Sequence, residues 1–158
     1  MKFRNRYLPD LTQAKEYELY EKYIHQAGDP EIHNGVYETI KALHDEWHKL
    51  FVLSGDPPSK LLPEVERWWL TNFFTKIVWA THDKTIGISL IIDEFHLDKD
   101  QTFFVGDTSG EVGEGKAAWV KTIGISRWYQ SRKWLDEAEA DFVIDDIIEI
   151  LGVIAPNL

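Results

Sequence analysis

The sequence contains no cysteine, which excludes disulfide bonds, thiolate metal sites and cysteine nucleophiles. Long apolar runs are also absent, and no stretch approaches the roughly 18 apolar residues of a membrane-spanning helix. The N-terminal segment MKFRNRYLPD lacks the apolar central run that a signal peptide carries. We therefore expect a protein of the cytoplasm.

Basic residues are scarce. Seventeen lysines and arginines stand against 27 acidic residues in a chain of 158, which gives a net charge of −10. Residues 81–158 hold 7 of the basic and 15 of the acidic residues, so this half contributes −8. A field of this sign repels nucleic acid and anionic membranes. Neither is expected as a partner, whereas a basic protein, a cation or a neutral ligand would fit.

Apolar residues are plentiful enough for a folded core, since 44% of the chain is hydrophobic and seven residues are tryptophan. A chain of this length and composition fits one globular domain, residues 1–158. Apolar residues recur at helical spacing in residues 11–25 and again in residues 30–50. The prolines in residues 54–63 indicate a loop, and a short helix can follow it. The helical part is therefore expected over about residues 10–70.

Runs of β-branched and aromatic residues predict a sheet over about residues 72–130. Turn-forming residues separate four predicted strands, at residues 72–81, 84–95, 101–106 and 117–126. Strands joined by such short connections pair with their neighbours, so we expect a mostly antiparallel meander of about four strands. Helical spacing then returns and predicts a C-terminal amphipathic helix over about residues 135–153, packed on the sheet. The predicted fold class is α+β, with N-terminal helices and a central mostly antiparallel sheet.

The hexapeptide KTIGIS occurs twice, at residues 84–89 and 121–126. The residues flanking the two copies differ, so a duplicated functional unit is disfavoured. We interpret both copies as sheet strands in which Gly87 and Gly124 leave a gap for a neighbouring aromatic ring or allow a local bend. The alternative is a pair of ligand-binding strands that present Ser89 and Ser126 together.

The segment HDEWH at residues 44–48 approaches a zinc motif, because His44 and His48 lie one helical turn apart. Asp45 stands where the motif needs the longer glutamate, and the sequence does not identify the third ligand, for which Glu64 and Glu66 are candidates. Histidines at the border of an amphipathic helix explain the pattern without a metal. We therefore predict no metal site and no cofactor.

Two further segments depart from known ligand loops. GEVGEGK at residues 110–116 has the glycine and lysine spacing of a phosphate-binding loop, but Ala117 follows where a hydroxyl is needed. We interpret this segment as a flexible hairpin loop. Residues 98–100 begin like a calcium loop, but Phe103 stands at the position that requires glycine, so we interpret them as a turn.

Acidic residues gather near the C-terminus, and the predicted helix would arrange them in a stripe. Four of them recur every four residues, and such like-charge neighbours cost a helix on the order of 1 kcal/mol in total. A solvated face explains the pattern simply, and a docking surface for a basic protein is the alternative. Large aromatic residues just before the stripe favour docking. The predicted partner-binding residues are Asp136, Glu137, Glu139, Asp141, Asp145, Asp146, Glu149, Trp128, Tyr129 and Trp134.

The hypothesis that follows is a small acidic inhibitory protein without enzymatic activity. Its size and charge are similar to those of an immunity protein, or antitoxin, that covers a basic toxin such as a nuclease. Two alternatives remain open at this point. One is a zinc-dependent hydrolase that uses the HDEWH helix, and the other is a peptide-binding module with an exposed sheet edge.

Overall fold

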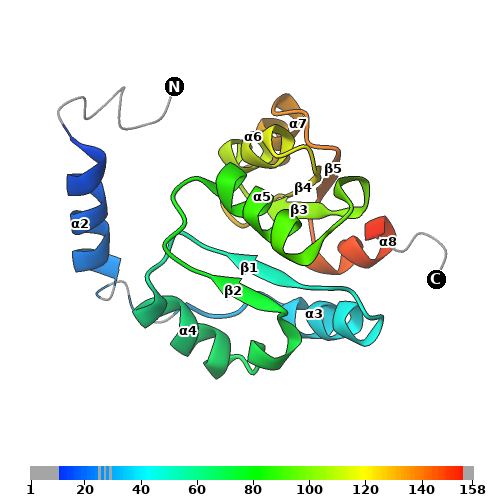
Figure 1. The fold of residues 1–158 in the computed structure, drawn as a ribbon, viewed down its shortest axis with the longest axis horizontal. Helices are drawn as coiled ribbons and strands as arrows, with labels where there is room; N and C mark the ends of the chain where they lie inside the picture. The colour runs from blue at the N-terminus through cyan, green and yellow to red at the C-terminus, as the bar shows by residue number, and fades with distance from the viewer. Residues whose placement is uncertain (1–10, 25, 27, 29, 155–158) are drawn as a thin grey trace.

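The computed structural model describes residues 11–24, 26, 28 and 30–154 (Figure 1). Two helices, α2 (Gln13–Ile24) and α3 (Val36–Asp45), precede the first strand, as predicted. From there strands and helices alternate: β1 (Phe51–Leu53), α4 (Pro58–Arg67), β2 (Lys76–Val78), α5 (Lys84–Phe95), β3 (Phe103–Gly106), α6 (Ser109–Ala117), β4 (Lys121–Ile125), α7 (Arg132–Glu137), β5 (Phe142–Ile144) and α8 (Ile150–Ile154). Short 3₁₀ helices are η1 (Thr71–Phe73), η2 (Lys99–Gln101) and η3 (Ile147–Glu149).

The predicted antiparallel meander is wrong, because every strand pair in the described residues is parallel. Strand β1 pairs with β2 in one sheet, and β3, β4 and β5 form a second sheet in that order. A parallel pair needs a long crossover between its strands, and here a helix supplies each crossover. The fold is therefore of the α/β type rather than α+β.

The repeated hexapeptide explains much of this error, because its two copies adopt different structures. Residues 121–126 contain strand β4, as predicted, but residues 84–89 form the first half of helix α5. Asp83 starts that helix by accepting a hydrogen bond from the backbone N–H of Ile86 at 3.1 Å. A Cβ atom on Gly87 would lie 2.8 Å from Leu53 Cδ1, so glycine lets the helix approach β1 closely.

Three other predicted segments also adopt a different structure. The predicted loop at residues 54–63 overlaps helix α4, which begins at Pro58. The expected hairpin loop at residues 110–116 lies within helix α6, and Thr108 caps this helix by accepting from the N–H of Glu111 at 3.1 Å. The predicted C-terminal helix over residues 135–153 is divided into α7, β5, η3 and α8. Its first break comes at Glu139, where φ is +56° and the helix cannot continue.

The core lies on both faces of the three-stranded sheet, around strand β4. Ile123 and Ile125 are fully buried and pack with Leu43 of α3 and Ile150 of α8. On the other face, Ile88 and Ile92 of α5 pack against residues that follow α6. Helices thus cover both faces, as parallel strands require. Among the described helices, none combines the length and apolar character needed to span a bilayer.

Candidate active site

The carboxyl ends of the parallel strands carry a group of polar residues. Ser54 follows β1 directly, and Asp107 follows β3 directly. Lys84 opens helix α5, whose first turn lies against β1 because Gly87 admits Leu53. Ligands of open parallel sheets bind outside the carboxyl ends of the strands, so this edge is the candidate site.

Glu111 holds the centre of this group. Its side-chain oxygen Oε2 accepts hydrogen bonds from the backbone N–H of Asp107 at 3.0 Å and from the hydroxyl of Thr108 at 3.3 Å. Its Oε1 forms an ion pair with Lys84, and both side chains are about one-fifth exposed, at 19% and 20%. A Cβ atom on Gly106 would lie 2.7 Å from the Cβ of Glu111, which explains the glycine before Asp107. Three elements, β3, α5 and α6, are thereby tied together at one carboxylate.

The two carboxylates of the site have opposite pKa shifts. Burial, together with the negative charge of Glu111, raises the pKa of Asp107 above its usual range. Burial also acts to raise the pKa of Glu111, but the charge and hydrogen bond of Lys84 outweigh it and lower that pKa overall. Lys84 therefore neutralises Glu111, whereas no lysine or arginine among the described residues forms an ion pair with Asp107. A proton or a metal cation at Asp107 relieves this repulsion.

The donor set fits magnesium better than zinc. Magnesium is bound through one or two carboxylates and keeps water and phosphate oxygens as its other ligands. Asp107 and Glu111 supply such a partial set. No group of three or more histidine, aspartate or glutamate side chains in the described part of the chain could hold a metal by itself. The site thus suits a cation that arrives with a phosphate group, with Asp107 as the available ligand.

Ser54 adds a hydroxyl on the β1 side of the same edge. It donates to Asp56 Oδ2 at 3.0 Å and accepts from the N–H of Asp56 at 3.1 Å. The N–H of Thr81 donates to the carbonyl of Ser54 at 3.0 Å, so the loop before α5 is held against the end of β1. This hydroxyl is a second group that could donate to a phosphate oxygen.

A hollow of about 430 Å³ opens beside Asp107 at the ends of β4 and β5. Gln130 lines this hollow and links it to the residues after β3. Its backbone N–H donates to the carbonyl of Asp107 at 3.3 Å, and its side-chain oxygen accepts from the N–H of Ser109 at 2.7 Å. Arg132 binds Asp145 at 3.2 Å, whereas Arg127 has no carboxylate within ion-pair distance among the described residues. The hollow is lined by Ser126, Arg127, Tyr129, Gln130, Ser131, Arg132 and Asp145.

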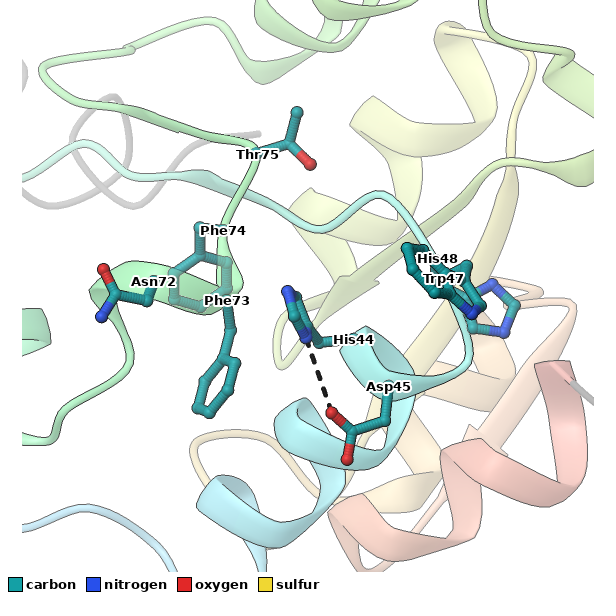
Figure 2. A pocket seen from close by; sticks show the side chains of 8 residues that line it. All are labelled: His44, Asp45, Trp47, His48, Asn72, Phe73, Phe74 and Thr75. Carbon is teal, nitrogen blue, oxygen red and sulfur yellow. Dashed lines mark ion pairs between the residues drawn. The ribbon is translucent and has the colours of Figure 1, made fainter.

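The histidines of the HDEWH segment lie at the opposite end of the strands. They line a pocket of about 520 Å³ beside Thr75, just before β2 begins (Figure 2). His44 contacts Asp45 at 3.7 Å and lies 5.2 Å from the ring of Phe73, while His48 contacts Glu46 at 3.7 Å. Asp45 also forms an ion pair with Lys41. These contacts agree with the interpretation as border histidines, and among the described residues no group of three potential metal ligands lies here.

The acidic residues near the C-terminus do not form a stripe, because no single helix carries them. Asp141 accepts hydrogen bonds from the N–H and hydroxyl of Thr122 at 2.7 and 2.8 Å. Asp146 and Glu149 form a capping box at η3. The remaining acids lie apart from one another, with Glu137 near Lys133, Glu139 bound to Lys116 and Asp145 bound to Ser126 and Arg132. Of the aromatic residues, Trp128 stacks on His33 at 4.5 Å, while Tyr129 and Trp134 are exposed.

Comparison with known proteins agrees with this geometry. Residues 3–125 match the family model described as haloacid dehalogenase-like hydrolase. The chain belongs to the haloacid dehalogenase-like hydrolase family. This finding overturns the prediction of an immunity protein without enzymatic activity, and a hydrolase of this family is not the zinc enzyme of the alternative.

Relatives of this haloacid dehalogenase-like chain are phosphatases. It is 23% identical over 155 residues to phosphoglycolate phosphatase from Vibrio vulnificus, covering 93% of this chain and 68% of that protein. It is 27% identical over 144 residues to pyrophosphatase PpaX from Halalkalibacterium halodurans, covering 85% of this chain and 67% of that protein. The chain thus spans about two thirds of these relatives.

Solved structures show the same haloacid dehalogenase-like fold. A predicted phosphatase from Clostridium acetobutylicum superposes with a TM-score of 0.86 at 18% identity, covering 97% of this chain and 75% of that chain. A hydrolase of this family from Streptococcus pneumoniae gives a TM-score of 0.80 at 14% identity, covering 97% of this chain and 76% of that chain.

Sequence reasoning missed Ser54, Lys84, Asp107 and Glu111. The signal was present in residues 103–111, where an apolar strand runs directly into Gly106 and Asp107 and then into the cap Thr108. A strand that ends in a short turn and a capped helix is typical of a parallel α/β unit. The antiparallel interpretation hid this pattern by treating residues 107–116 as a loop.

Proposed function

We propose that this chain binds a phosphate group with a divalent cation and serves the hydrolysis of small phosphate esters or anhydrides. The observation that carries the proposal is the Lys84, Glu111 and Asp107 cluster at the carboxyl edge of a family hydrolase fold. The names of the relatives, phosphoglycolate phosphatase and pyrophosphatase, support this substrate class. The cytoplasm remains the proposed location.

Each side chain has a role that its contacts allow. Lys84 has three donors and uses one on Glu111, so it can also donate to a phosphate oxygen. Ser54 can turn its hydroxyl from Asp56 to the phosphate. Asp107 would hold the cation, with Glu111 beside it. A bound magnesium ion would withdraw charge from the phosphoryl group.

The hollow beside Gln130 provides room for the rest of the substrate. Arg127 lines this hollow and brings a positive charge to it. Both substrates named by the relatives carry a second anionic group. We therefore place that group near Arg127.

The test uses the purified chain with two readouts. Calorimetry measures the binding of inorganic phosphate with and without magnesium, and a colorimetric assay measures phosphate released from phosphoglycolate and pyrophosphate. We expect binding to require magnesium and to fall at least about tenfold in Asp107→Asn and Lys84→Met. Asp93→Asn, an exposed change on α5, is the matched control and should bind like the wild type. Magnesium-independent binding, or equal binding by all four proteins, would overturn the proposal.

A further inference from the structure

Three tryptophans lie at helix ends. Trp47, Trp69 and Trp119 have φ values of +67°, +55° and +64°, in the left-handed region. Each is the residue after the cap of its helix, and its N–H and that of the next residue bond back into the last turn, as with Trp47 to His44 at 2.9 Å and His48 to Leu43 at 3.1 Å. This pattern is the Schellman motif, whose left-handed position is usually glycine.

The tryptophan side chains gain little burial at these three positions. The three side chains are 93%, 80% and 79% exposed. A bulky residue in this conformation is strained, and three of the seven tryptophans in the chain share it. We infer that these are glycine positions of the fold, and that the codon read here as tryptophan specifies glycine in the source organism. The UGA codon has this property, since some genetic codes assign it to tryptophan and others to glycine.

Peptide mass spectrometry of the protein purified from its native source tests this inference directly. We expect the peptides that cover positions 47, 69 and 119 to have the masses of glycine-containing peptides. Tryptophan-containing masses at all three positions would overturn it. The measurement needs no activity, so it is independent of the proposed function.

Discussion

Lys84 and Glu111 form an ion pair between the first turns of α5 and α6, and no such ion pair forms at Asp107 within the described part of the chain. The crossover helices on either side of β3 are thereby joined at the strand's carboxyl end. Charge balance at the site then depends on what binds Asp107.

Asp107→Asn should stabilise the metal-free protein near neutral pH. The folded-state pKa of Asp107 is raised, so its contribution to stability is present below its unfolded pKa and is lost as pH rises through the folded value. We expect the variant to melt about 2–4 °C above the wild type near pH 7 and to show no gain near pH 3, where the carboxyl is protonated. Added magnesium should raise the melting temperature of the wild type only. Calorimetric melting at both pH values checks this, and equal magnesium shifts in the two proteins would contradict it.

Gly87→Ala and Gly113→Ala should change stability in opposite directions, although both glycines lie inside helices. A Cβ atom on Gly87 would lie 2.8 Å from Leu53 and 2.9 Å from Thr81, whereas nothing lies within 4 Å of one on Gly113. We expect Gly87→Ala to lower the free energy of unfolding by about 1–3 kcal/mol. Gly113→Ala should raise it by roughly 0.5–1 kcal/mol, because alanine favours the helix. Urea denaturation measures both, and a stabilising Gly87→Ala would contradict the close packing of α5 on β1.

Many helices and strands could be located from the sequence, but some helices were predicted as strands or loops. Strand β4 lies within a predicted strand, and helices α2 and α3 lie within predicted helices. Helix α5 could not be told from a strand, because its isoleucines and threonine favour strands and its apolar residues follow no clear helical period. In the second copy, the first five of the same six residues form strand β4, which β3 and β5 flank. Tertiary contacts decide between the two structures.

The residues at which the helices end could not be predicted, for a different reason. Glycine after a helix is the usual stop signal, but Trp47, Trp69 and Trp119 occupy those positions. Residues 117–126 therefore look like one continuous strand, although α6 ends at Ala117 and β4 begins at Lys121. Without these stop signals, the alternation of strands and helices could not be recognised in the sequence. The site at the carboxyl ends of the strands was therefore not predicted either.

Trp→Gly at positions 47, 69 and 119 should stabilise the chain. Glycine adopts a positive φ without steric cost, and the exposed tryptophan side chains contribute little packing. We expect each replacement to raise the free energy of unfolding by about 1 kcal/mol and the triple variant to gain roughly their sum, since the sites lie on different helices. Trp→Ala at the same positions keeps the Cβ atom and should give no such gain. Equal effects of glycine and alanine would show that backbone strain is not the cause.

Asp141→Ala should be far more costly than Asp136→Ala, although the two acids are five positions apart. Asp141 accepts from the N–H and the hydroxyl of Thr122, and Thr122 is fully buried, so truncation leaves two donors without a partner. We expect a loss of about 1–3 kcal/mol in the free energy of unfolding. Asp136 is exposed, and its removal should change stability by less than about 0.5 kcal/mol. Thr122→Val combined with Asp141→Ala removes the hydroxyl donor as well and should recover part of the loss. If urea denaturation gave equal values for the two single variants, Asp141 would have no role in joining β4 to β5.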